Sequence, residues 1–209
     1  MVDQNYTHVV LLIDRSGSMS TVHSETINGL NHFVEQQRAV DGKCLLDAWG
    51  FDDKLEQVID SLPVADVKAF TNEDFTPRGW TALCDSIGVV VKSLGDRFSA
   101  LKESDRPRRV LFVIMTDGHE NASQGYTYDS VREMIIHQTD VYSWDFVFLG
   151  ADIDVPKVQS HLGIADAYTF NKMDVGDAIA AVGKAAAGYR TSGTQSFHSN
   201  IVLNSTYLK

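Results

Sequence analysis

Cysteines, long apolar runs and basic residues are all scarce in this 209-residue chain. Cys44 and Cys84 are its only cysteines, so the sequence does not support a disulfide framework. No apolar run approaches the ~18 residues that a bilayer-spanning helix needs, and the polar start from Met1 to Thr7 is unlike a secretory signal. We therefore expect a cytoplasmic protein that does not enter a membrane.

Positive charge is also in short supply. The chain has 18 Lys and Arg against 28 Asp and Glu, a formal net charge of -10. Nucleic-acid binding depends mainly on Lys and Arg that neutralise phosphates, so this balance argues against a nucleic-acid partner. The basic cluster Arg106, Arg108 and Arg109 is interpreted as the solvated approach to a strand.

Strand-like and helix-like segments alternate along the chain, which predicts a largely parallel α/β sheet covered by helices on both faces. Its length and its 44% hydrophobic composition suit one domain, placed at residues 1–190. The predicted strands are His8 to Ile13, Leu45 to Phe51, Val110 to Met115, Asp145 to Leu149 and Ala167 to Phe170. The more polar segment Lys54 to Ile59 follows a turn and is predicted to pair antiparallel at an edge.

Apolar residues at helical spacing predict four helices, and a shorter one follows a cap signal. The four are marked by Ile27 to Val34, Leu83 to Leu101, Val131 to Ile135, and Ile179 to Ala186 with Asp174 as the expected N-cap. Asp154 with Pro156 marks the start of the short helix. Residues 191–209 form a linker and tail, in which Ile201 to Leu203 is expected either to add a strand or to stay mobile.

Three segments carry oxygen-bearing side chains where buried strands end or a helix begins. Asp14, Ser16 and Ser18 follow the apolar run Val9 to Ile13; Thr81 precedes an apolar helix; and Asp117 follows the third predicted strand. In open parallel sheets, ligands gather beyond the carboxyl ends of the strands, so these segments are expected to converge.

Two carboxylates balance a divalent ion, and three hydroxyls add neutral oxygen ligands that leave the metal electrophilic. Octahedral Mg²⁺ suits this set better than Ca²⁺, which takes ~6–8 oxygens, and Mn²⁺ accepts the same ligands. One coordination position remains for an outside ligand, most naturally a carboxylate. The sequence therefore predicts a Mg²⁺ or Mn²⁺ site made by Asp14, Ser16, Ser18, Thr81 and Asp117.

The pattern Asp14-x-Ser16-x-Ser18, then Thr81, then Thr116-Asp117-Gly118 resembles the metal-ion-dependent adhesion site of von Willebrand factor A domains, over roughly residues 6 to 190. The resemblance implies a doubly wound, mostly parallel sheet with one antiparallel edge strand and helices on both faces. It also implies that Ser16, Ser18 and Thr81 bind the ion directly, while the two aspartates bind directly or through water. Extracellular members of this family often carry a disulfide near their termini. Because this chain lacks suitable cysteines and a signal sequence, it resembles the stand-alone bacterial and phage members more than the extracellular ones.

Several neighbouring residues have more than one interpretation. Asp14 and the serines could cap a helix instead of binding metal. Asp85 is either a first-turn residue favoured by the helix dipole or a residue that orients a metal-bound water. His119, Glu120 and Asn121 are expected at a solvent-exposed rim, and Trp80 either at the rim, as an anchor for a partner, or packed beneath its loop.

The favoured function is a non-enzymatic, monomeric protein-binding module that holds an exposed Asp or Glu of a partner protein through Mg²⁺. One alternative is a Mg²⁺-dependent phosphoryl-transfer enzyme that forms an aspartyl phosphate, although such enzymes would normally need a second acid where Ser16 stands. The other is an assembly component in which the metal is purely structural.

Overall fold

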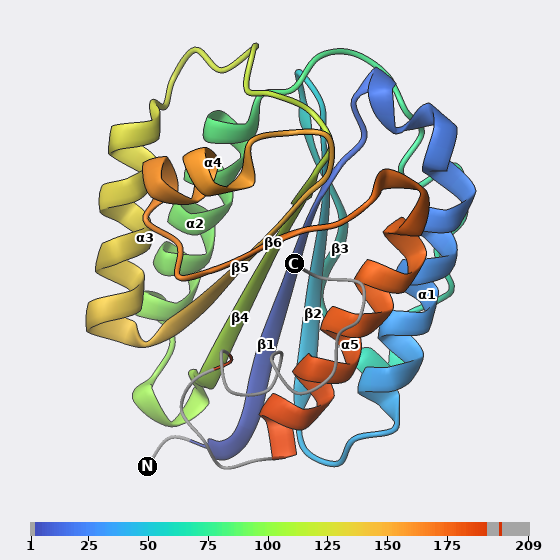
Figure 1. The fold of residues 1–209 in the computed structure, drawn as a ribbon. Coiled ribbons are helices and arrows are strands. Elements are labelled where there is room, and N and C mark those ends of the chain that lie inside the picture. The colour runs from blue at the N-terminus through green and yellow to red at the C-terminus, as the bar shows by residue number, and fades with distance from the viewer. Residues whose placement is uncertain (1–2, 192–196, 198–209) are drawn as a thin grey trace.

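The computed structural model describes residues 3–191 and residue 197, which form a six-stranded sheet between two layers of helices (Figure 1). The strand order is β3-β2-β1-β4-β5-β6, and only β3 runs antiparallel to its neighbour. The strands are β1 (Asp3–Asp14), β2 (Cys44–Phe51), β3 (Leu55–Pro63), β4 (Pro107–Thr116), β5 (Trp144–Gly150) and β6 (Asp166–Thr169).

Helices cover both faces of the sheet. Helices α1 and α5 pack together on one face, and α2, α3 and α4 lie on the other (Figure 1). Their bounds are α1 (His23–Arg38), α2 (Leu83–Ala100), α3 (Tyr128–Tyr142), α4 (Val155–Leu162) and α5 (Val175–Thr191). The predicted fold class, a doubly wound sheet with one antiparallel edge strand, is confirmed.

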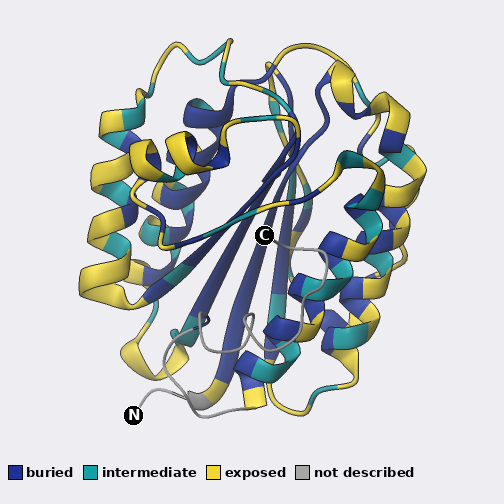
Figure 2. Cartoon of the chain, in the orientation of Figure 1, coloured by how far each residue is buried: buried dark blue, intermediate teal, exposed yellow. Residues whose placement is uncertain are grey.

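The central strand β1 supplies both cores. Val9 and Leu11 pack on the side of α1 and α5, whereas Val10 and Leu12 pack on the side of α2 and α3. Successive side chains of a strand point to opposite faces, so a strand with helices on both sides must be apolar throughout. Figure 2 shows the central strands buried and the outward faces of the helices exposed.

Several predicted boundaries differ from the observed ones. Strand β1 begins at Asp3, five residues before the predicted start, and β3 continues to Pro63. Asp154 caps α4, as predicted, by accepting a hydrogen bond from the Lys157 backbone N–H. A 3-10 turn over Lys172–Asp174 precedes α5, and the Asn171 side chain caps this turn. Asp174 directly precedes Val175, the first residue of α5, so its expected role as the N-cap of that helix stays a prediction.

The chain reverses its direction of travel across the sheet between β1 and β4. Strands β2 and β3 extend the sheet to one side of β1, and β4, β5 and β6 extend it to the other. Ile13 pairs with Met115, so the carboxyl ends of β1 and β4 lie side by side. Ligand sites of open α/β sheets form at such a switch point.

Both cysteines are buried and free, in agreement with the absence of a disulfide framework. Within residues 3–191, none of the helices combines the length and the apolar character that crossing a bilayer requires. Phe197 is fully buried against the α1 and α5 side of the core. The Ile201 to Leu203 segment lies outside the described residues.

Candidate metal centre

A chain of hydrogen bonds joins four of the five predicted ligands. Asp14 Oδ1 accepts from the Ser16 backbone N–H at 2.6 Å, and the Ser16 and Ser18 hydroxyl oxygens lie 3.0 Å apart. Ser18 Oγ donates to Asp117 Oδ1 at 2.6 Å. Side chains 99 residues apart in the sequence are thus in direct contact at the carboxyl edge of the sheet.

Thr81, the fifth residue, borders the same point. A Cβ atom built on Gly118 would lie 2.6 Å from Thr81 Oγ1 and 3.4 Å from Asp14 Oδ2. The threonine hydroxyl and the Asp14 carboxylate therefore both face Gly118, and any side chain at this position would collide with the hydroxyl. The structure brings all five residues together; their role as metal ligands stays a prediction.

Backbone hydrogen bonds hold the loop that presents Thr81. The Arg78 N–H donates to the Arg15 carbonyl at 2.8 Å, and the Ala82 N–H donates to the Asp52 carbonyl at 2.9 Å. Gly79 has a φ of +65°, and an added Cβ would clash with the Asp53 carboxylate, so glycine is strongly favoured at this turn.

An ion-pair network that the sequence did not reveal supports this loop. Arg15, the residue between Asp14 and Ser16, is 3% exposed, and its Nε lies 2.9 Å from Asp52 Oδ2. Arg78 pairs with the same Asp52 oxygen at 2.9 Å, and Glu56 bridges Arg15 and Arg78. These residues come from three distant segments, so no local pattern in the sequence could have linked them.

The loop after Asp117 holds the other side of Thr81. Asn121 Oδ1 accepts from the Thr81 N–H at 2.9 Å, and the Asn121 N–H donates to the Thr81 carbonyl at 3.0 Å. Glu120 is half-buried and accepts from the Cys84 N–H at 2.7 Å. The expectation of a solvent-exposed rim therefore holds for His119 and Asn121, which are exposed, and is wrong for Glu120, which is half-buried. Glu120 and Asn121 also fix the two loops in place through these hydrogen bonds.

Asp85 binds the same loop instead of facing the five-residue cluster. Its carboxylate accepts hydrogen bonds from the backbone N–H groups of Gln124, Gly125 and Tyr126 at 2.7 to 2.9 Å. This gives Asp85 a clear structural role in holding the loop.

Burial dominates the electrostatics of Asp14. The residue is 1% exposed, and desolvation raises the pKa of its carboxyl to about 6 against the opposing hydrogen bond from Thr116 Oγ1. The neighbouring Asp117 carboxylate raises the pKa further. Two buried carboxylates at one point favour the arrival of a cation.

The residues present fit a hard divalent cation. Asp117 Oδ2 is buried and accepts no hydrogen bond from the described residues, although Lys172 Nζ lies 2.5 Å away. Within the described residues, no three His, Cys, Asp or Glu side chains gather as a ligand cluster, so the donor set consists of two carboxylates and three hydroxyls. Such all-oxygen sets suit Mg²⁺ and Mn²⁺.

The helix-cap interpretation of Ser16 finds no support. Ser16 occupies the N-cap position of a 3-10 helix over Gly17–Val22, but its side chain makes no capping hydrogen bond. Trp80, next to Thr81, is 68% exposed, so of its two interpretations the structure supports the rim and not burial beneath the loop.

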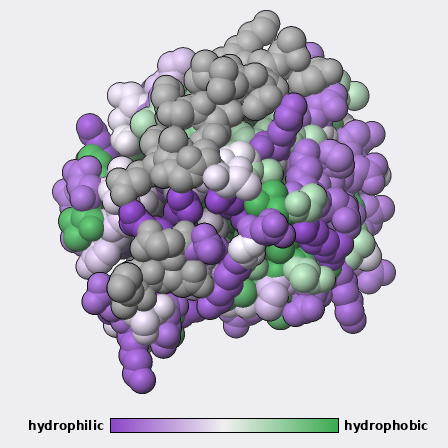
Figure 3. Space-filling model, turned by 90° about the horizontal axis from the view of Figure 1, so that it is seen from below, coloured by the Kyte–Doolittle hydropathy of each residue, from purple (hydrophilic) through white to green (hydrophobic). Residues whose placement is uncertain are grey.

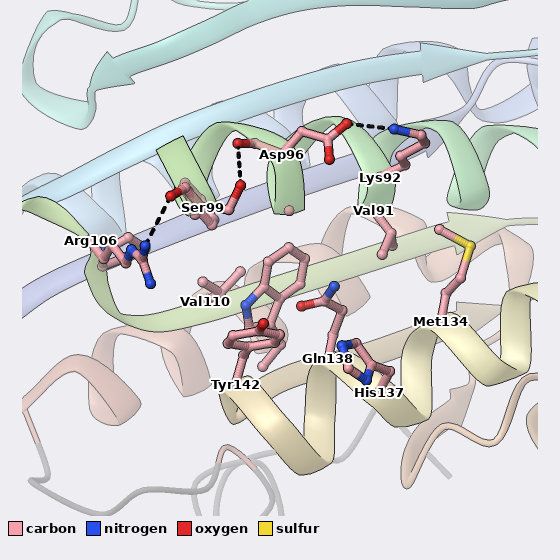
Figure 4. Close-up of a pocket in the computed structure, with 14 residues that line it drawn as sticks. Val91, Lys92, Asp96, Ser99, Arg106, Val110, Met134, His137, Gln138 and Tyr142 are labelled. Carbon is pink, nitrogen blue, oxygen red and sulfur yellow. Dashed lines mark hydrogen bonds and ion pairs between the residues drawn. The ribbon is translucent and has the colours of Figure 1, made fainter. Parts of the chain in front are cut away.

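A cavity of about 400 Å³ lies elsewhere, between α2 and α3 (Figure 4). It reaches Val110 and Trp144 at the amino ends of β4 and β5, the opposite end of the sheet from Asp14. Its Lys92 and Asp96 pair at 2.6 Å, and Arg106 donates to backbone carbonyls. The described surface seen from the amino ends of the strands is mostly hydrophilic (Figure 3). No ligating set comparable to the five-residue cluster is found in this cavity.

No protein-family model matches the sequence, and no curated protein matches it. Solved structures do match the fold. A von Willebrand factor type A protein from Catenulispora acidiphila aligns over 88% of this chain and 43% of its own, with a TM-score of 0.61 and 12% identity.

Two further solved structures were determined with metal. Proximal thread matrix protein 1 from the mussel byssus, with a zinc-occupied MIDAS motif, covers 90% of this chain and 47% of its own, with a TM-score of 0.58 and 13% identity. Manganese-loaded TRAP protein from Plasmodium vivax aligns over 86% of this chain and 72% of its own, with a TM-score of 0.56 and 17% identity. The chain spans less than half of the Catenulispora and mussel structures. These likenesses show that the chain has the von Willebrand factor A fold.

Proposed function

We propose that this chain is a protein-binding module, not an enzyme, which holds an acidic side chain of a partner protein through a divalent ion. The observation that carries the proposal is the buried oxygen cluster, in which the Lys172 ammonium is the one partner of Asp117 Oδ2 among the described residues. The zinc and manganese in the MIDAS-containing mussel protein and in the Plasmodium protein support a divalent ion at the equivalent place.

The five residues have distinct roles in this proposal. Asp14 and Asp117 neutralise the ion, directly or through water, and Ser16, Ser18 and Thr81 bind it with uncharged oxygens. A bound Mg²⁺ or Mn²⁺ would supply positive charge that attracts a carboxylate from outside. The three hydroxyl ligands add no negative charge, so the ion stays electrophilic and its open position accepts a carboxylate.

The surroundings of Asp14 favour binding over phosphoryl transfer. Both of its carboxylate oxygens accept hydrogen bonds, from the Ser16 N–H and from Thr116 Oγ1, and the residue is 1% exposed. A nucleophile needs free access to its substrate and an adjacent acid or base, and the position two residues later is a serine. Trp80, exposed beside Thr81, supplies an aromatic contact for the partner.

Calorimetric titration of Mn²⁺ and Mg²⁺ into chelator-treated protein tests the metal. We expect one ion per chain, and loss of binding in Ser18→Ala and in Asp117→Asn. Ser20→Ala is the matched control, because Ser20 is exposed on the same 3-10 helix and its side chain has no hydrogen bond among the described residues. Equal binding by all variants would place the ion elsewhere.

A second titration tests the carboxylate. Mn²⁺-loaded protein is titrated with a short peptide that contains one Asp and with the same peptide carrying Asn. Binding of the Asp peptide alone, abolished by chelation, supports the proposal. A metal that raises the melting temperature without any carboxylate preference would instead indicate a structural ion, and Asp14-dependent hydrolysis of acetyl phosphate would indicate an enzyme.

A further inference from the structure

A lysine from a distant part of the chain reaches the candidate metal centre. Lys172 lies in the 3-10 turn between β6 and α5, and its Nζ donates to the Ser18 carbonyl at 2.7 Å. The same Nζ lies 2.5 Å from Asp117 Oδ2, the oxygen that accepts no hydrogen bond within the described residues. The Lys172 side chain is 19% exposed and that of Asp117 is 1% exposed, so this ion pair is largely shielded from water.

The ammonium group occupies the position expected of a cation. Asp117 would otherwise be a buried carboxylate with only the Ser18 hydroxyl as a partner, and a buried charge without a counter-ion is strongly unfavourable. An ammonium group is a compact positive charge that can contact oxygen atoms in several directions, as a small metal ion does. Asp14, in contrast, forms no ion pair within the described part of the chain and is stabilised by hydrogen bonds.

We propose that Lys172 is a tethered cation that competes with the metal for Asp117 and thereby selects divalent over monovalent ions. This inference rests on the proposed metal site. A divalent ion brings two positive charges where the ammonium brings one, so it gains attraction to the two carboxylates when it displaces Lys172. A sodium or potassium ion brings no additional charge and must still displace a group that is already attached to the chain.

The main experiment combines two measurements on Lys172→Met, which keeps the length of the side chain and removes its charge. In chelator-treated protein, the variant should melt several degrees lower, because Asp117 loses its counter-ion. In calorimetry, the same variant should bind Mn²⁺ about tenfold more tightly, because the competing charge is gone. Lys184→Met is the matched control: Lys184 is exposed on α5, and neither measurement should change.

Competition predicts that the melting temperature falls while the Mn²⁺ affinity rises, whereas a merely structural ion pair predicts only the fall in melting temperature. Unchanged Mn²⁺ affinity with a lower melting temperature would overturn the inference and leave the proposed function standing. Weaker Mn²⁺ binding would show that Lys172 positions a ligand, which also overturns it. If neither wild type nor variant bound Mn²⁺, the proposed function itself would fail. Lys172→Gln provides a second neutral variant should the methionine chain not fold.

Selectivity is tested by the choice of salt at constant ionic strength. In wild type, replacing tetramethylammonium chloride by sodium chloride should leave the Mn²⁺ affinity unchanged. In Lys172→Met, sodium ions should weaken Mn²⁺ binding severalfold, since they can now enter the site whereas the bulky cation cannot. Equal effects of sodium in both proteins would contradict the role in selection.

Discussion

Single residues at the carboxyl edge of the sheet balance desolvation against hydrogen bonding. Asp14 lies at the end of a strand that is buried on both faces, and its two oxygens accept from the Ser16 N–H and from Thr116 Oγ1. These hydrogen bonds do not offset burial fully, so the pKa of Asp14 is raised to about 6. The ionised carboxylate is therefore destabilising at neutral pH until a cation approaches.

Asp14→Asn should separate stability from metal binding. An amide keeps the acceptor for Ser16 and offers a donor to Thr116 Oγ1, which can turn its own hydrogen toward the Gly118 carbonyl. Without the buried charge, the metal-free protein at pH 7 should gain roughly 1–3 kcal/mol in free energy of unfolding. Urea denaturation measures this gain, and calorimetry should show that Mn²⁺ binding is lost. A less stable variant would contradict the account.

Between elements, α2 and the loop after β4 cap each other. The first N–H groups of α2 donate to this loop, at Cys84 to Glu120 Oε2 and at Asp85 to Ser123 Oγ. The Asp85 carboxylate in turn accepts three hydrogen bonds from the loop backbone. A helix that begins with free N–H groups thus fixes the loop that follows Asp117.

Asp85→Ala tests this exchange. Three backbone N–H groups would lose their acceptor, so we expect a loss of roughly 2 kcal/mol in free energy of unfolding. Asp129→Ala is the control, because Asp129 is an exposed first-turn residue of α3 and contributes only through the helix dipole, about 0.3–1 kcal/mol. Urea denaturation of both variants provides the comparison. Equal losses in free energy of unfolding would mean that Asp85 contributes through the helix dipole and not through its hydrogen bonds to the loop.

The network under the Thr81 loop predicts a pH dependence. Hydrogen bonds from Arg15 and Arg78 lower the pKa of Glu56 from its usual 4.5 to about 2. A carboxyl whose pKa is lower in the folded state stabilises the protein above its unfolded pKa and loses this contribution as the pH falls toward the folded value. The stability gap between wild type and Glu56→Gln should therefore be constant above about pH 5 and shrink between pH 4.5 and 2.

Urea midpoints at a series of pH values measure this gap. Glu56 is half-exposed, so we expect a small effect that weakens further at high salt. Glu73→Gln is the control, because the Glu73 side chain is exposed and forms no ion pair among the residues described. A gap for Glu56→Gln that is independent of pH would contradict the ion-pair origin.

For the whole molecule, the question is where the domain ends. The predicted boundary at residue 190 remains a prediction, yet Phe197 is fully buried and contacts the Tyr189 ring edge-on. Asp145 joins both, since it accepts from Tyr189 Oη at 2.5 Å and from the Phe197 N–H at 3.0 Å.

Phe197→Ala should therefore destabilise the protein as a core substitution does, by about 3–5 kcal/mol. Phe197→Leu keeps most of the volume and should lose less than about 1.5 kcal/mol. Thermal and urea unfolding of both variants give the comparison. A neutral alanine variant would support a domain that ends at residue 190.

Patterns along the chain were enough to predict the layers of the fold and to select the five candidate ligands that the structure brings together. Continuous apolar runs in the central strands, helices of period 3.6 and polar residues at strand ends are local signals that survive folding, because they reflect which side chains leave water. Boundaries were less accurate: β1 begins five residues earlier than predicted, because pairing with β4 extends it beyond its apolar run.

Contacts between distant segments were decided only by the tertiary structure. Asn121 binds the Thr81 backbone, Glu56 bridges Arg15 and Arg78, and Lys172 reaches Asp117 across 55 positions of sequence. A sequence shows a side chain's chemistry but not which far-off groups will lie within 3 Å of it. By itself the sequence determined the sheet, its two helical layers and the oxygen-rich edge, because burial follows from pattern; the fold alone decided which charges meet there, because Coulomb attraction depends on distance in space.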